Sequence, residues 1–514
     1  MTDRIADALQ RAKTLSPTVK IAFVTPELQS LVRRTNLAEI SEALPRTLRE
    51  AGHDVRVFLP FTRDVNTFPM QGLDPCGSVT VQGERGPISL NLHQGLLGDL
   101  PVILFDHEQL FRNRHPYGDE NGPYLDNWLR FSVFARAVLA ALEELKFKPD
   151  VLHCMDWTSG LVPVYRELEY LHAKPDHPAS RAGVYFAIHN LAMQGSFERE
   201  ILPRIGLPME TFQHIRGVAL DGRVNFLKAG AEFATVIGTH SPAQAQRIQH
   251  TDRGYGLEET FLRRKKELVG VTNGIDYTTW DPSTDELLPQ TFSASDGGDF
   301  AGKRKCKAAL QDLLKLDRGP RTPIVGVIGR FDADSGCDLL AEIMTHVLER
   351  NFEVVMMGSG QAEILDRIRT IESTFMGRCR LIDGYHVQVA HQLLAGIDIL
   401  ALPSHYQPSN ALCAIGMRYG AVPIVYEHSG LDDTVIDLVQ NPAQGTGLFF
   451  RQYSGAGLLE TLDSARTAYK AAATWKEAVR RCLELDFSWQ ATAANYLKAY
   501  RRVTRRVKAQ LEEV

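Results

Sequence analysis

Residues 397–427 read IDILALPSHYQPSNALCAIGMRYGAVPIVYE, and this stretch decides the fold class. It opens with a short apolar run, 397–404, and closes with a second one, 422–427. A segment that we interpret as helical separates the two runs. Two short buried strands joined by a helix form a β-α-β unit, in which the strands are parallel. The stretch therefore predicts a parallel sheet.

The same alternation extends along the rest of the chain. Predicted strands lie at 19–27, 54–60 and 149–157 in the first half and at 322–331, 352–360 and 379–385 in the second. Helical patterns at 37–52 and 131–147 separate the early strands. Repeated β-α-β units on both sides of a middle region predict an α/β protein with two doubly wound, Rossmann-like domains of parallel sheet. We expect ligands to bind at the carboxyl ends of the strands, in a cleft between the domains.

The middle region, 273–289, is rich in Asp, Pro, Thr and Gly, and we expect it to be a hinge. The expected divisions of the chain are an N-terminal extension (1–18), a first domain (19–272), the hinge, a second domain (290–486) and a C-terminal helical segment (487–514). The extension carries Ile5, Leu9 and Leu15 at loose helical spacing, which suits either a solvated cap or a helix that docks a partner.

Composition narrows the class of protein. The 514 residues carry a formal net charge of −5, which gives no general electrostatic reason to bind nucleic acid or an anionic membrane. The seven cysteines are odd in number and scattered, so we expect neither a disulfide framework nor a structural zinc site. This cysteine pattern is typical of a protein in the reducing cytoplasm. No secretory signal and no membrane-spanning run is evident in the sequence.

Ordered motifs then identify the chain as a member of a known family. HCMDW (153–157), FAIHNLAMQGSF (186–197), RVNFLKAGAEFATVIGTHSP (223–242) and the block 404–435 resemble, in this order, motifs of bacterial glycogen synthases and plant starch synthases. In that family they usually read H-x-H-D-W, T-I-H-N-L-x-Y-Q-G, N-F-L-K-A-G followed by T-V-S-P, and a block that begins S-R-x-E-P-C-G. The resemblance covers the chain from Val19 to about Arg502.

The resemblance implies a GT-B fold and a retaining glucosyltransferase. Such an enzyme transfers glucose from ADP-glucose, or a related nucleotide sugar, to the non-reducing end of an α-1,4-glucan. It implies no metal and no cofactor, because cationic side chains and backbone N–H groups can neutralise the departing diphosphate. The expected binding partners are the glucan and the nucleotide sugar. The resemblance also implies that the C-terminal helix crosses back to the first domain.

Motif positions carry the expected site residues. His189, Asp156 and Gln407 occupy the catalytic positions, Gln407 in place of the family glutamate. Three residues match the wall that faces the acceptor and the sugar: Trp157, Asn190 and Asn225. The expected donor-binding residues are Arg33, Arg34, Arg330, Tyr385, Ser409, Asn410, Gly430, Asp433 and Thr434. Gly358 and Gly360 suit either a phosphate-binding loop or an ordinary turn.

Several donor-site positions depart from the family pattern. The loop that usually reads K-x-G-G-L-x-D-V here reads RRTNLAEI (33–40), so Thr35 and Asn36 replace two glycines and are expected to obstruct close approach of a phosphate. This loop is either an ordinary polar surface loop or a phosphate grip rebuilt from two arginines. A second phosphate-binding segment of the family corresponds here to GRFDADSG (329–336), which we call the clamp loop. Ser335 stands at the position of the family lysine, and two aspartates, Asp332 and Asp334, make the loop more negative than the family pattern. Gln407 lacks the negative charge that a cationic transition state favours, which we expect to cost about 10²–10³ in rate.

Two functions from different classes are consistent with these residues. The first is a glucosyltransferase with an adapted donor site. The second is a non-catalytic relative that keeps a glucan-binding surface and acts as a regulatory or scaffold protein. A transferase that builds another polymer is a third. Arg33 and Arg34 discriminate between the first two, because only an active site needs replacement cations there.

Overall fold

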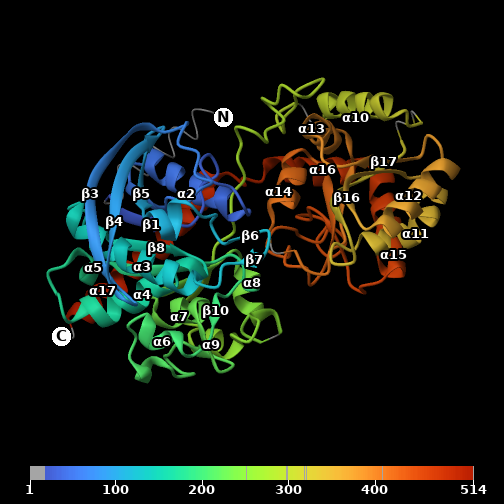
Figure 1. The fold of residues 1–514 in the computed structure, drawn as a ribbon. Helices are drawn as coiled ribbons and strands as arrows, with labels where there is room; N and C mark the ends of the chain where they lie inside the picture. The colour runs from blue at the N-terminus through green and yellow to red at the C-terminus, as the bar shows by residue number, and fades with distance from the viewer. Residues whose placement is uncertain are drawn as a thin grey trace. The chain divides into compact units, whose positions relative to one another are not determined.

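A computed structural model describes residues 18–250, 252–296, 299–317, 319, 321–407 and 409–512. The chain forms two compact units (Figure 1). Unit 1 contains the chain up to Val271 together with the segment from Thr492 onward, and unit 2 spans Thr272–Ala491. The expected N-terminal helix with Ile5, Leu9 and Leu15 lies outside the described residues.

Unit 1 is built on a nine-stranded sheet of order β14-β13-β9-β8-β1-β2-β5-β4-β3. Its strands, in that order, are β14 (Leu268–Gly270), β13 (Val236–Thr239), β9 (Gly183–Ile188), β8 (Val151–Met155), β1 (Lys20–Val24), β2 (Asp54–Pro60), β5 (Leu100–Asp106), β4 (Gly86–Leu97) and β3 (Gln71–Gly83). The α-helices of the unit are α2 (Leu37–Glu50), α3 (Asn127–Glu144), α4 (Leu161–Tyr165), α5 (Pro178–Arg181), α6 (Ile201–Arg204), α7 (Phe226–Phe233), α8 (Pro242–Arg247), α9 (Glu258–Arg263) and, from Thr492 onward, α17 (Trp489–Glu512).

From β14 to β5 the strands pair in parallel, but β3 and β4 form an antiparallel hairpin at one edge, labelled in Figure 1. The prediction of a parallel doubly wound sheet is therefore confirmed for the centre and incomplete at this edge. The hairpin closes through the pair Gly83 and Gly86, leaving two residues in the turn. Alternating apolar and polar residues on both sides of such a turn are the usual sequence signal for a hairpin. We followed the β-α-β pattern in the sequence and did not predict this hairpin.

The helix predicted at 37–52 forms as α2, with Leu37, Leu44 and Leu48 buried on one face. It ends at Glu50, and Gly52 adopts a φ of +93°, which favours glycine. The last helix of the chain, α17, completes the packing of unit 1. The hydroxyl of Tyr500 lies 2.7 Å from Nδ1 of the buried His153 on β8.

Unit 2 has a six-stranded parallel sheet of order β17-β16-β15-β18-β19-β20. The strands are β15 (Ile324–Phe331), β16 (Glu353–Gly360), β17 (Cys379–Asp383), β18 (Ile399–Leu402), β19 (Val422–Tyr426) and β20 (Leu448–Phe450). The helices are α10 (Ala301–Leu314), α11 (Cys337–Glu349), α12 (Ala362–Thr374), α13 (Val387–Gly396), α14 (Ala411–Arg418), α15 (Gly455–Lys470) and α16 (Ala472–Glu484). Every strand predicted between 322 and 427 is present.

The segment expected to be a hinge packs into unit 2 along part of its length. Oδ2 of Asp285 accepts hydrogen bonds from Nδ1 of His391 at 2.8 Å and from the hydroxyl of Tyr419 at 2.5 Å. The indole ring of Trp280 stacks on His391 with 4.0 Å between ring centroids. These buried contacts attach residues 280–285 to α13 and to the turn after α14.

Candidate active site

In unit 1, the strands β13, β9, β8 and β1 are neighbours, and the expected site residues follow their carboxyl ends. The turn after β1 is organised by Glu27, whose side chain is fully buried. Its carboxylate accepts hydrogen bonds from the backbone N–H of Arg34 at 2.6 Å and of Thr35 at 2.8 Å, and from the hydroxyls of Thr35 at 2.9 Å and Tyr117 at 2.5 Å. Burial, together with the neighbouring Glu27, raises the pKa of Tyr117 well above its ordinary value. One buried carboxylate therefore fixes the loop that carries Arg33 to Asn36.

Thr35 and Asn36 fit the backbone of this loop without a positive φ. The hydroxyl of Thr35 turns inward to Glu27. Asn36, at the N-terminus of α2, has a φ of −67°, which any L-residue adopts. The backbone conformation therefore does not require glycine at Asn36. Obstruction of a phosphate by these two exposed side chains stays a prediction.

Arg33 and Arg34 differ in the number of contacts that their side chains make. The guanidinium of Arg34 donates to Oδ2 of Asp64 at 2.9 Å and lies 3.1 Å from Nδ1 of His115. Although burial alone would raise the pKa of Asp64, the hydrogen bonds from Arg34 and His115 lower it below its ordinary value. Arg33 is exposed and has no hydrogen bond or ion pair with the described part of the chain. In this loop, Arg33 is thus the cation that is free to bind a ligand. The side chain of Arg34 is instead fixed by Asp64 and His115.

Asp156 joins the ends of β8 and β9. Its Oδ1 accepts hydrogen bonds from the backbone N–H of His189 at 2.7 Å and of Asn190 at 3.3 Å. Its φ of +52° and ψ of −171° lie in a region that costs a non-glycine residue about 1–3 kcal/mol. Burial raises the pKa of Asp156 to about 7, in spite of the two backbone hydrogen bonds that lower it. Strain of this kind concentrates at functional sites.

One ring nitrogen of His189, Nε2, is buried and has no hydrogen-bond partner among the described residues. Burial lowers the pKa of His189 to about 4, so the ring is neutral at physiological pH. Burial, with a smaller contribution from His189, lowers the pKa of His240 to about 3. His240 follows β13 and occupies the valine position of the T-V-S-P pattern, a substitution that the sequence analysis did not recognise as part of the site.

The expected acceptor wall is only partly exposed. Trp157 is 8 % exposed and packs with its ring edge-on to Phe131, at 4.9 Å between centroids. Asn225 is buried, and its side chain caps α7 by accepting from the backbone N–H of Lys228 at 2.8 Å and donates to Gln194 at 2.6 Å. These contacts do not support Asn225 as a sugar ligand. Asn190 is exposed at the rim.

In unit 2, the clamp loop follows β15. The side chain of Arg330 is 78 % exposed and pairs with Asp332 at 3.1 Å. Ser335 does not replace the family lysine functionally, because its hydroxyl donates to the backbone carbonyl of Asp332 at 2.7 Å and closes a tight turn. The cation of this clamp is therefore Arg330 alone, and it is partly neutralised by its own loop.

The glycines at the end of β16 have a structural explanation. A Cβ on Gly358 would lie 1.8 Å from the carbonyl oxygen of Gly329, and a Cβ on Gly360 would lie 2.2 Å from that of Phe331. The close approach of β15 and β16 thus accounts for both residues. Tyr385 lies 58 % exposed after β17.

The donor block after β18 folds against the turn that follows β19. The backbone N–H of Gln407 donates to the carbonyl of Ser429 at 2.7 Å. Asn410 is 9 % exposed and donates to the carbonyl of Asn273 at 3.3 Å, so its side chain turns away from the open face. Ser409 is half-buried, and its hydroxyl accepts from the backbone N–H of Ala411 at 3.3 Å. Pro408 lies outside the described residues.

The second half of the donor block is the turn that contains Gly430, Asp433 and Thr434. Gly430 adopts a φ of +111°, a conformation that favours glycine. Asp433 is exposed, whereas Thr434 is buried and its backbone N–H donates to the carbonyl of Leu431 at 2.8 Å. The structure therefore brings Arg330, Gln407 and Gly430 to the carboxyl edge of one sheet, with Ser409, Asn410, Asp433 and Thr434 beside them.

An aromatic group completes this edge and was not anticipated. His405 stacks on Tyr426 with 5.5 Å between ring centroids and meets Tyr453 edge-on at 4.7 Å. The hydroxyl of Tyr453 approaches the carbonyl of Ala333 in the clamp loop at 3.5 Å. The sequence offered one indication of this aromatic group: His405 follows one predicted strand (397–404), and Tyr426 lies near the end of the next (422–427). Stacked rings beside a phosphate clamp can hold a flat base or a sugar ring.

Comparisons with known proteins agree with this arrangement. A family model described as the starch synthase catalytic domain matches residues 20–263. The chain is 35 % identical over 492 residues to a glycogen synthase of Geotalea uraniireducens, which covers 94 % of this chain and 98 % of that protein. It is 34 % identical over 487 residues to glycogen synthase 2 of Geobacter metallireducens, with 94 % and 98 % covered.

Solved structures agree as well. The catalytic domain of starch synthase IV from Arabidopsis thaliana, bound to ADP and acarbose, superimposes with a TM-score of 0.79 at 28 % identity, covering 95 % of this chain and 100 % of that one. Sucrose-phosphate synthase from Thermosynechococcus elongatus shares the fold, with a TM-score of 0.54 at 16 % identity over 94 % and 98 % of the two chains.

Proposed function

Because the chain belongs to the glycogen and starch synthase family of glucosyltransferases, with the GT-B fold, we propose that it extends an α-1,4-glucan at the non-reducing end, with ADP-glucose as donor and with retention. The observation that carries this proposal is the neutral, buried and unpartnered Nε2 of His189, beside the strained Asp156. This nitrogen is inaccessible to water in the described structure, so a hydroxyl of the transferred glucose would satisfy it only after binding opens the site. An unsatisfied buried polar atom costs about 1–3 kcal/mol, which binding of a sugar would recover.

The diphosphate needs positive charge, which exposed arginines at the expected donor positions can supply. Arg33 stands at the N-terminus of α2, where Asn36 makes no side-chain cap, so the helix end can also attract an anion. In unit 2, Arg330 is the exposed cation of the clamp loop. We propose that Arg330 contributes to neutralising the leaving diphosphate, without a metal ion. The Arabidopsis structure contains ADP and acarbose, which supports a nucleotide and a glucan as ligands of this chain.

A cytoplasmic place of action is part of the proposal. All seven cysteines are free thiols, and six of them are buried, as in proteins of a reducing compartment. No helix in the described part of the chain is long and apolar enough to span a membrane.

The test is a transfer assay with ADP-glucose and maltoheptaose that measures both ADP release and the configuration of the new bond. We expect α-linked products from the natural protein. The variant His189→Gln should lose a factor of about 100 or more in kcat while still binding ADP. The exposed His172, changed to Gln, serves as the matched control. Absence of transfer by the natural protein from any nucleotide glucose would overturn the proposal.

A further inference from the structure

A cavity of about 480 Å³ lies in unit 1, away from the residues of the candidate active site. Its lining includes Thr235, which directly precedes β13, and Glu267, which directly precedes β14. The cavity is therefore at the amino edge of the parallel strands, whereas Asp156 and His189 follow the carboxyl ends of β8 and β9. Segments far apart in the chain form its walls: the short helix Arg166–Leu171, the carboxyl ends of α7 and α9, and α17.

The lining of this cavity carries more positive than negative charge, although the chain as a whole has a net charge of −5. Phe233 is the one aromatic residue in the described lining. The basic residues are all arginines and outnumber the acidic ones; they are Arg166, Arg216, Arg263, Arg264 and Arg506, against Glu167, Glu232 and Glu267. An excess of positive charge in one concavity favours an anionic ligand.

Three of the five arginines already have partners in the walls. The side chain of Glu232 is fully buried, and its Oε2 accepts from Nη2 of Arg263 at 2.5 Å. Oε1 of Glu267 lies 2.8 Å from Nη1 of Arg506. Arg264 donates to the backbone carbonyl of Glu232, at the end of α7, at 2.8 Å. Ion pairs therefore neutralise Arg263 and Arg506, and Arg264 is held by the helix end.

Arg166 is a buried cation that lacks an anionic partner. It is 4 % exposed, and its Nε and Nη2 donate to the backbone carbonyls of Ala179 and Ser180, each at 3.2 Å. Its Nη1 has no hydrogen bond, and the guanidinium has no ion pair, with any residue in the described ranges. Burial lowers the pKa of Arg166 to about 10, although Glu167 raises it, so the group stays charged at physiological pH. A buried charge without a counter-charge is costly, and an anion in the cavity would remove that cost.

Arg216 is the second cation available to a ligand. It is exposed, and it has no hydrogen bond or ion pair to the part of the chain that the structure describes. It lines the cavity from the loop that precedes β11 (Ala219–Leu220), and the exposed amide of Gln510 on α17 also lines it. A ligand in the cavity would therefore meet one buried and one exposed guanidinium, neither of which the protein neutralises.

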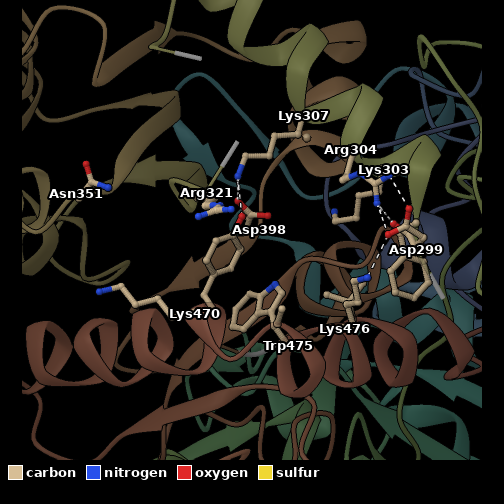
Figure 2. Close-up of a pocket in the computed structure, with 15 residues that line it drawn as sticks. Asp299, Lys303, Arg304, Lys307, Arg321, Asn351, Asp398, Lys470, Trp475 and Lys476 are labelled. Atoms are coloured by element: carbon tan, nitrogen blue, oxygen red, sulfur yellow. Dashed lines mark hydrogen bonds and ion pairs between the residues drawn. The ribbon is translucent and has the colours of Figure 1, made fainter. Parts of the chain in front are cut away.

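The cavity of unit 2 that Figure 2 shows differs in this respect. Its buried Lys303 donates to three backbone carbonyls, at 3.2, 3.0 and 2.7 Å, which matches the three N–H groups of an ammonium. Lys307 donates to Oδ2 of Asp398 at 2.6 Å, a pair drawn in Figure 2. The buried cations of that cavity are thus satisfied by the protein itself, whereas Arg166 is not.

We propose that the unit 1 cavity binds a condensed phosphate, a compact ligand with two linked phosphoryl groups and neither a sugar nor a base. One phosphoryl group would accept hydrogen bonds from the guanidinium of Arg166 and the other from that of Arg216. The planar fork of a guanidinium matches phosphate oxygens, and a phosphoryl group carries more negative charge than a carboxylate. With Phe233 as the one aromatic residue of the described lining, a sugar ring or a base would find little surface to stack on. The site shares no residue with the proposed donor site.

The experiment is calorimetric titration of the full chain with pyrophosphate, inorganic phosphate and succinate as probes, in the presence of saturating ADP. Because ADP occupies the proposed donor site, pyrophosphate that still binds must bind elsewhere. We expect pyrophosphate to bind about tenfold or more tightly than inorganic phosphate, which has one phosphoryl group, and than succinate, which has two carboxylates.

Variants of the lining test where the ligand lies. Arg216→Ala changes an exposed side chain and should weaken pyrophosphate binding about tenfold. Arg166→Gln should weaken it at least as much, and its thermal unfolding shows whether this buried variant folds; Arg216→Ala decides the question if it does not. Glu167→Gln removes a negative charge from the lining and should tighten binding about threefold. Arg85→Ala, at the exposed turn between β3 and β4, is the matched control and should bind as the natural protein does.

Four results would overturn the inference. The first is no binding of pyrophosphate in saturating ADP, which would leave the donor site as its only site. The second is equally tight binding of inorganic phosphate or succinate, which would show that the cavity does not select two linked phosphoryl groups. The third is unchanged affinity in Arg216→Ala. The fourth is equal loss of affinity in Arg216→Ala and Arg85→Ala, which would indicate a general charge effect.

Discussion

Replacing Glu27 by Gln tests whether one buried carboxylate holds the loop that carries Arg33. The carboxylate accepts four hydrogen bonds, two from the backbone N–H groups of Arg34 and Thr35 and two from the hydroxyls of Thr35 and Tyr117. A hydrogen bond to a charged group contributes roughly 1 kcal/mol more than a neutral one. In the Gln variant an NH₂ group, itself a donor, also replaces one of the two oxygens that now accept hydrogen bonds, so donors face a donor there. Relief from burying a charge offsets part of the loss, so we expect a net cost of about 3 kcal/mol.

The assay is hydrogen exchange measured by mass spectrometry on the peptide that contains Arg34 and Thr35. Their amide protons are bonded directly to Glu27, so a cost of about 3 kcal/mol corresponds to exchange about 100-fold faster. Tyr117→Phe, which removes one of the four bonds, should accelerate exchange about tenfold. Glu50→Gln, at the exposed end of α2, should have no effect. Exchange in Glu27→Gln within twofold of the natural protein would refute the reasoning.

Three further predictions concern packing, charge and pH. Gly358→Ala places a methyl group against the carbonyl of Gly329, at a φ of +154°, and should lower the free energy of unfolding of unit 2 by about 3 kcal/mol or more, measured by urea unfolding. Gln407→Glu restores the carboxylate that the family resemblance implies and should raise kcat about tenfold or more in the transfer assay; an unchanged kcat would show that this side chain does not face the reacting sugar. Burial lowers the pKa of His240 from 6.5 to about 3, so the unfolded chain binds an extra proton between these values and stability falls as pH decreases from 6.5. His240→Gln should flatten this slope in thermal unfolding, and an unchanged slope would contradict the buried environment.

Much of the fold could be predicted because the strands are short, apolar and bounded by turn residues. Apolar runs such as 54–60 and 352–360 became β2 and β16 almost residue for residue. The hairpin β3–β4 could not be read in the same way, since its outer strand is largely exposed and contains Pro75 and several glycines. Edge strands of this kind lack the buried pattern on which the prediction depends.

The site was predicted less completely because sequence order shows where a side chain is attached but not where it points. Asn225 and Asn410 occupy family positions, yet their amides bond to neighbouring protein groups. Thr35 turns toward Glu27, a residue that no motif singled out. His240 was visible in THSP, but its proximity to His189 depends on β9 and β13 being neighbours in the sheet. Pairings between distant strands carry this information, and local sequence does not.

The last helix has a consequence for how the protein is made. Residues from Thr492 onward belong to unit 1, although the ribosome synthesises them after all of unit 2. Until these residues emerge from the ribosome, Tyr500 cannot form its hydrogen bond with His153. Val503 likewise cannot pack against Gly183 on β9. At about 5–20 residues per second, synthesis of unit 2 takes on the order of tens of seconds. During that interval the nascent chain exposes the apolar surface that α17 later covers, so unit 1, which is started first, is finished last.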